Sequence, residues 1–140
     1  MRTVEASRFV AAGPDRVSRL LTPESIVAYE GTFEVTEVTP RGAEGDWLVA
    51  VGARGLDATL RFEPLEDGDG FYYEQLGEEG PLAAMETTLV WRPENEGTRV
   101  TATSSVSLGV RPASLADRIA AWKRKGELRR ALEALAADAE

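Results

Sequence analysis

Apolar and polar residues alternate with a period of two through the middle of the chain, from residue 32 to residue 108. Turn-forming residues interrupt this pattern about every ten residues, as they do between the strands of hairpins. The segments between the turns predict six strands, at residues 32–39, 46–53, 56–63, 71–76, 85–92 and 98–108. A looser alternation at residues 3–10 predicts a seventh strand. Strands joined in sequence order by short turns predict an antiparallel meander.

The alternation also gives the predicted strands two chemically different faces. One face is apolar with a few small hydroxyl residues: Trp47, Val49, Val51, Ala58, Leu60, Phe62, Met85, Thr87, Leu89, Trp91, Val100, Ala102, Ser104 and Val106. The other face is charged or hydroxyl-bearing: Asp57, Thr59, Arg61, Glu63, Arg99, Thr101, Thr103 and Ser105. An antiparallel sheet with one apolar face is expected to be covered from one side only.

Two short helices are predicted between the first two strands. Pro14 opens the first of them, because proline is favoured in the first turn of a helix. Thr22 is a candidate N-cap for the second helix, with Pro23 at its first helical position. Gly31 ends this second helix.

The last quarter of the chain predicts one long helix, from Leu115 to Asp138, that would cover the apolar face of the sheet. Ser114 and Asp117 have the spacing of a capping box at its start. The large apolar residues of this helix form two groups that point in different directions: Leu115, Ile119 and Trp122, then Leu128, Leu132 and Leu135. Gly126 lies at the change of face, so we expect a bend there that brings both groups onto one surface.

The predicted sheet is wider than the helix that covers it. Seven strands at about 4.8 Å spacing span roughly 30 Å, whereas a helix is about 10 Å across. The sheet must therefore curl, and we expect a cavity where the two surfaces do not meet. Small polar residues among bulky apolar ones are typical of a site that orients a mostly apolar ligand. The candidate cavity residues are Trp47, Leu60, Phe62, Tyr73, Met85, Thr87, Leu89, Ala102, Ser104, Ile119 and Trp122. For Trp47, Trp91 and Trp122, core packing is the simpler explanation.

The chain contains no cysteine and no histidine. Disulfides, Cys/His metal sites and nucleophiles activated by a histidine base are therefore excluded. The sequence contains no D-x-[DN]-x-[DN]-G run, which is the pattern of a carboxylate calcium-binding loop. We therefore expect neither a metal nor a cofactor. The candidates for proton transfer are Glu86 and Tyr73. Alternation points Tyr73 inward and Glu86 outward, and only an inward, poorly solvated Glu86 would serve as a general acid or base.

The 140 residues carry a formal charge of −8, and their number fits one domain, residues 1–140. An acidic chain argues against nucleic acid as a partner. No run is long and apolar enough for a transmembrane helix, and the chain does not open with a signal-peptide pattern, so we expect a cytoplasmic protein. Arginine strongly exceeds lysine and acids exceed both, which indicates either a halophilic origin or a GC-rich genome.

Five cations cluster on the predicted long helix: Lys123, Arg124, Lys125, Arg129 and Arg130. A solvated helix face is the simpler interpretation of this cluster. A binding site for an anion or an acidic lipid is the alternative.

Three segments resemble parts of one known family. They are Ala12-Gly13-Pro14-Asp15-Arg16-Val17 with Leu20-Leu21, Trp91-Arg92-Pro93 followed by Gly97-Thr98-Arg99-Val100-Thr101, and the terminal helix. Together with the order of elements, they resemble the helix-grip fold of the START-related (SRPBCC) superfamily, which includes birch-pollen-allergen-like and polyketide cyclase/dehydrase-like proteins. The resemblance implies an α+β fold in which a curved, seven-stranded antiparallel sheet wraps around a long C-terminal helix, with two short helices after the first strand. The resemblance does not identify a catalytic residue in this sequence.

Members of this superfamily typically bind lipids, polyketides, steroids, quinones or plant hormones between helix and sheet. The resemblance therefore implies a carrier or sensor for a small, largely hydrophobic molecule. One alternative is a cyclase or dehydratase that uses tyrosine and glutamate acid-base groups in the same cavity. The other alternative is a module that binds another protein through the basic helix or a sheet edge.

Overall fold

A computed structural model describes residues 1–40, 45–66, 69–77 and 82–140. The strands are β1 (Arg2–Val10), β2 (Glu34–Pro40), β3 (Trp47–Ala53), β4 (Leu56–Pro64), β5 (Gly70–Leu76), β6 (Ala84–Glu94) and β7 (Gly97–Ser107). The helices are α1 (Pro14–Leu20), α2 (Pro23–Glu30) and α3 (Ala113–Ala139). Every predicted strand and helix is present, with ends shifted by a few residues. Parts of the turns expected between strands, at 41–44, 67–68 and 78–81, lie outside the described residues.

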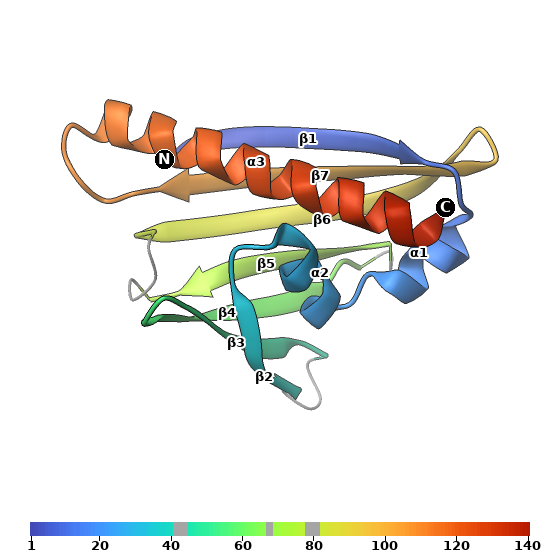
Figure 1. The fold of residues 1–140 in the computed structure, drawn as a ribbon, viewed down its shortest axis with the longest axis horizontal. Coiled ribbons are helices and arrows are strands. Elements are labelled where there is room, and N and C mark those ends of the chain that lie inside the picture. Colours follow the sequence, from blue (N-terminus) through green and yellow to red (C-terminus); the bar gives the residue numbers. More distant parts are fainter. Residues whose placement is uncertain (41–44, 67–68, 78–81) are drawn as a thin grey trace.

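The seven strands form one antiparallel sheet in the order β1-β7-β6-β5-β4-β3-β2. The meander runs from β2 to β7, and β1 joins it by pairing with β7. Figure 1 shows the three helices on one face of the curved sheet, with α3 running along β1 and β7 and α2 between α3 and the β2–β3 edge. This is the helix-grip architecture that the sequence predicted. No helix among the described residues is long and apolar enough to cross a membrane.

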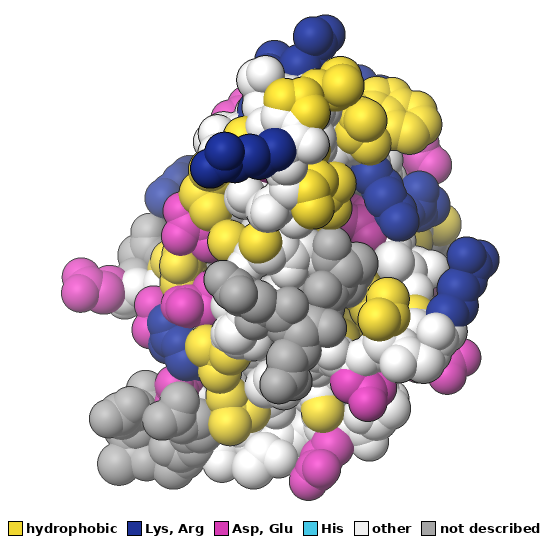
Figure 2. Space-filling view, turned by 90° about the vertical axis from the view of Figure 1, so that its left-hand side faces the viewer, with side chains coloured by type: hydrophobic (Ala, Val, Ile, Leu, Met, Phe, Trp, Pro, Cys, Tyr) yellow, Lys and Arg dark blue, Asp and Glu magenta, His cyan; other side chains and the backbone are white. Residues whose placement is uncertain are grey.

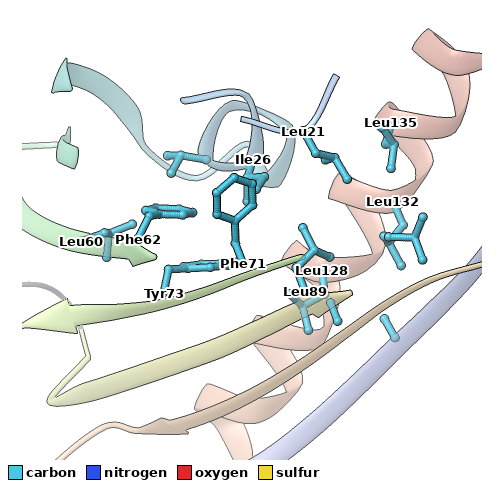
Figure 3. Close-up of a cluster of buried hydrophobic side chains, with 14 of the residues drawn as sticks. Leu21, Ile26, Leu60, Phe62, Phe71, Tyr73, Leu89, Leu128, Leu132 and Leu135 are labelled. Atoms are coloured by element: carbon cyan, nitrogen blue, oxygen red, sulfur yellow. The ribbon is translucent and has the colours of Figure 1, made fainter. Parts of the chain in front are cut away.

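The alternation assigned the faces of the sheet correctly. Every residue predicted for the apolar face is buried, apart from Trp47, which is half-buried. Figure 3 shows the cluster of buried side chains that the sheet and helices enclose, to which β4 and β5 contribute Phe62 and Phe71. The opposite face is polar, and there Arg61 forms ion pairs with Glu63 at 2.9 Å and Glu74 at 2.7 Å.

The ends of α2 confirm the predicted capping. The hydroxyl of Thr22 accepts a hydrogen bond from the Ser25 amide, and the Ser25 hydroxyl is an acceptor for the Thr22 amide. These two bonds satisfy amides that the first helical turn leaves without partners. Gly31 ends the helix with φ of 79°, a left-handed conformation that glycine adopts at little cost.

The predicted capping box at the start of α3 is wrong. The helix begins at Ala113, and its N-cap residue, Pro112, makes no side-chain capping bond. Asp117 does not close a capping box. Its carboxylate instead accepts hydrogen bonds from the Leu108 amide at 3.0 Å and the Met1 amino group at 2.9 Å. This carboxylate therefore ties the helix to the end of β7 and to the start of β1.

The predicted change of face at Gly126 is also wrong. A single stripe of α3 is buried along its whole length: Ala116, Asp117, Ala120, Ala121, Arg124, Glu127, Leu128, Leu132, Leu135, Ala136 and Ala139. The first group of large residues lies outside this stripe, because Leu115 is 53%, Ile119 56% and Trp122 80% exposed. The prediction oriented the first half of the helix by its largest apolar side chains. The residues that face the sheet in this half are mainly alanines. Trp122 is consequently neither a core residue nor a wall of the cavity.

Candidate functional site

A cavity of about 140 Å³ lies under the first half of α3, between that helix, α2 and strands β3 to β6. Of the sixteen described residues that line it, ten are apolar: Val27, Phe33, Val51, Ala58, Leu60, Leu82, Met85, Leu108, Ile119 and Ala120. A cavity of about 150 Å³ with apolar walls is large enough to hold benzene. The space under α3 therefore suits one ring or a short branched chain.

The cavity reaches the surface at the N-terminal end of α3. Exposed Ile119 and exposed Lys123 line it there, together with half-buried Leu82 and Leu108. Figure 2 faces this end of the molecule, where hydrophobic side chains gather over the start of α3 with Lys and Arg side chains among them. A molecule longer than one ring could extend outward through this mouth.

The inner end of the cavity is polar and centres on Arg124, which is only 3% exposed. Its Nη1 donates to Glu30 Oε2 at 2.9 Å and to Glu127 Oε1 at 3.3 Å. Thr32 donates from its hydroxyl to the other oxygen of Glu127. Burial acts to lower the pKa of Arg124, but the neighbouring charges, foremost that of Glu30, raise it overall. Arg124 is therefore a permanent buried cation.

Three hydroxyl groups from neighbouring strands take the remaining donors of Arg124. Its Nε donates to Ser104 Oγ at 2.9 Å, and its Nη2 donates to Thr87 Oγ1 at 2.9 Å and Tyr73 Oη at 3.1 Å. Strand register places these hydroxyls in one row, because Tyr73 pairs with Thr87 and Thr87 with Ser104. All five N–H groups of the guanidinium therefore have acceptors within the protein.

Tyr73 joins the hydroxyl row to the carboxylates. Its hydroxyl donates to Glu30 Oε1 at 2.6 Å, and its ring stacks on Phe62 with centroids 4.3 Å apart. Burial and the negative charge of Glu30 raise the pKa of Tyr73 above its ordinary value. Tyr73 is therefore a neutral phenol at physiological pH and holds the Glu30 carboxylate in place.

The predicted cavity residues fall into four groups in the structure. Leu60, Met85 and Ile119 line the cavity. Tyr73, Thr87 and Ser104 lie in the polar network behind its inner end. The hydrophobic core includes Phe62, Leu89 and Ala102. The two tryptophans lie outside the cavity lining: Trp47 packs edge-on against Phe71 at 5.8 Å, and Trp122 is exposed.

Glu86, the candidate acid, lies on the opposite face of the sheet. It is exposed and accepts a hydrogen bond from Tyr72 Oη at 3.0 Å. Alternation had favoured this outward position. Glu86 is therefore not among the residues that line the cavity.

Arg124 and Glu127 are central polar residues of this site, and neither is among the cavity residues predicted from the sequence. Arg124 had been grouped with the solvated cations of the helix, and that interpretation is wrong for this residue. A usable signal was present, since stepping back from Leu135 through Leu132 and Leu128 at helical spacing lands on Arg124. Arg124 was assigned to the solvated face because it is charged, although its helical position places it on the inward stripe.

No family model matches the chain, and neither does any curated protein. Solved structures with the same fold include the Zhui aromatase/cyclase from Streptomyces sp. R1128, which is 20% identical with a TM-score of 0.76 over 99% of this chain and 93% of that chain. The di-domain ARO/CYC BexL from the BE-7585A biosynthetic pathway is 22% identical with a TM-score of 0.67 over 94% of this chain and 45% of that chain. Ara h 8.0201 is 9% identical with a TM-score of 0.56 over 97% and 98% of the two chains.

These likenesses agree with the architecture described above. The chain has a helix-grip fold similar to that of the Zhui aromatase/cyclase. At these levels of identity the likeness concerns the fold, and the function must be argued from the cavity itself.

Proposed function

We propose that this protein binds a small, largely hydrophobic molecule under α3, as a carrier or a sensor. The observation that carries the proposal is the cavity of about 140 Å³, with apolar walls and one polar end. Such a combination is typical of sites that bury an apolar body and orient it with a few polar contacts. The predicted ligand classes, lipid, polyketide or quinone, share a ring or chain that fits this space.

Cyclase or dehydratase chemistry is the second candidate, because two of the similar structures are aromatase/cyclases. Of the predicted acid-base groups, Glu86 faces away and Tyr73 is a neutral phenol engaged with Glu30. Among the described residues, the acidic groups that line the cavity are Glu30 and Glu127, and both bind Arg124. Both carboxylates are engaged in a hydrogen-bonded network with Arg124, so the geometry supports binding better than catalysis.

Filling the cavity tests the proposal. Ala120 lines the cavity, and Ala120→Leu places three more carbon atoms in it. Propylbenzene should bind the unmodified protein in isothermal titration calorimetry, and Ala120→Leu should weaken this binding at least about tenfold, since the space for one ring is lost. Ala137→Leu makes the same change on the exposed side of α3 and should bind like the unmodified protein.

Equal propylbenzene affinity in all three proteins, or no binding to the unmodified protein, would contradict the proposal. A native mass spectrum of the freshly purified protein complements the titration. A mass that is present in the folded protein and released on unfolding would begin to identify the natural ligand.

A further inference from the structure

The side-chain donors of Arg124, Tyr73 and Thr32, at the polar end of the cavity, are already engaged with acceptors in the described part of the chain. Every N–H of Arg124 is directed at a protein acceptor, and Tyr73 Oη and Thr32 Oγ1 donate to Glu30 and Glu127 respectively. A ligand that needs a donor at this end would have to displace one of these buried contacts. Each such displacement leaves a buried acceptor unsatisfied, which is costly.

Acceptor capacity, in contrast, remains at the same place. A carboxylate has about four lone-pair sites. Within the described part of the chain, the side chain of Glu127 accepts from Arg124 and Thr32, and that of Glu30 accepts from Arg124 and Tyr73. Both glutamates line the cavity, so the remaining lone-pair sites are within reach of a bound molecule.

The charges of Arg124, Glu30 and Glu127 also favour a hydrogen-bond donor on the ligand at this end. One guanidinium and two carboxylates leave a formal charge of −1 at the inner end. Among the described residues that line the cavity, the other charged one is Lys123, which is exposed at the mouth. An anionic group on a ligand is therefore repelled from the inner end, whereas at the mouth it can pair with Lys123 and keep its contact with water.

From these contacts we infer that the ligand enters with a hydrogen-bond donor first: a ring hydroxyl or amine that donates to Glu127 or Glu30. Its apolar tail, and any carboxylate or phosphate, lies toward Lys123 at the mouth. This inference rests on the proposed function and adds to it the class and the orientation of the ligand. It assigns Glu127 and Glu30 as the acceptors that select that class.

Three probes that differ in one group test this assignment by isothermal titration calorimetry. 4-Propylphenol carries a donor, 4-propylanisole carries an acceptor without a donor, and propylbenzene carries neither. A hydrogen bond to a charged group contributes about 1.5–3 kcal/mol, so 4-propylphenol should bind at least about tenfold more tightly than either other probe. 4-Propylanisole should bind no more tightly than propylbenzene, because its oxygen faces carboxylates.

The outcomes separate the two proposals. If propylbenzene fails to bind, the hydrophobic cavity itself is refuted and this inference falls with it. If propylbenzene binds and 4-propylphenol binds no more tightly, the proposed function stands and the donor-first inference is overturned. If 4-propylanisole is the tightest ligand, the inner end offers a free donor and the inference is equally overturned.

The variant Glu127→Gln locates the effect at one residue. A neutral amide accepts a weaker hydrogen bond than a carboxylate, so the preference for 4-propylphenol over propylbenzene should fall about fivefold. The preference is a ratio of two affinities measured on the same variant, so a change in cavity affinity common to both probes cancels from it. Glu133→Gln, on the exposed side of the same helix, should leave the preference unaltered. A preference that persists in Glu127→Gln and in Glu30→Gln overturns the assignment.

Discussion

The two halves of α3 face the same sheet with opposite side-chain patterns. The first half turns alanines inward at positions 116, 120 and 121 and leaves its largest side chains, such as Trp122, in solvent. The second half turns Leu128, Leu132 and Leu135 inward and presents charged residues such as Glu133 to water. Figure 3 shows these three leucines projecting from α3 into the buried cluster. The first half of α3 therefore covers the cavity, and the second half packs into the hydrophobic core.

This difference shows how a single element provides both stability and space. Leucines fill the volume between helix and sheet, whereas an alanine stripe leaves part of it open where the sheet curves away. Arg124 lies at the boundary between the two halves and binds α2 through Glu30 and β5 through Tyr73. The polar network therefore closes the inner end of the cavity and separates it from the leucine core.

The largest effect is expected at this boundary. Arg124→Met removes the cation but leaves Glu30 and Glu127 buried, and the loss of one partner from a buried ion pair costs about 3–5 kcal/mol. Urea unfolding should show this decrease in the free energy of unfolding, whereas Arg129→Met, an exposed position on the same helix, should change it by less than about 0.5 kcal/mol.

A double variant identifies the cause of that loss. Adding Glu127→Gln to Arg124→Met removes one of the two uncompensated buried charges, so the double variant should be more stable than Arg124→Met alone. If the double variant is less stable than Arg124→Met, uncompensated charge is not the source of the effect.

A second test compares leucines from the two halves directly. Leu132 is 4% exposed and Leu115 is 53% exposed. Leu132→Ala should therefore lower the free energy of unfolding by about 2–5 kcal/mol through lost burial and a new cavity, and Leu115→Ala by less than about 0.5 kcal/mol. Urea denaturation of both variants checks the contrast. Comparable losses would mean that the first half also packs into the core.

The sequence predicted the parts of this structure that depend on periodicity. Period-two alternation identified the seven strands and both faces of the sheet, since a strand's side chains alternate strictly between two faces. It also turned Tyr73, Thr87 and Ser104 inward, although it did not reveal what they bind. The caps of α2 followed from Thr22 and Gly31, because these residue types satisfy local backbone demands.

The errors arose where tertiary packing decides orientation. The hydrophobic pattern of α3 treats alanine as neutral and arginine as outward, but an alanine stripe allows close approach to the sheet, and Arg124 is stabilised by acceptors from distant segments. Glu30 and Tyr73 lie 94 and 51 residues away from Arg124 in the chain. No local pattern contains such partners, so helical spacing could place Arg124 on the inward stripe but could not show which groups it binds.

The smallest effect is expected for the largest side chain of the first half. Trp122 is 80% exposed, so Trp122→Ser removes little buried area and should change the free energy of unfolding by less than about 0.5 kcal/mol. A tryptophan in a core would instead cost about 3–5 kcal/mol when truncated. Because Trp122 does not line the cavity, propylbenzene should bind Trp122→Ser as it binds the unmodified protein. Urea unfolding and calorimetric titration of this one variant test both statements, and a large loss in either would restore Trp122 to the core or to the cavity wall.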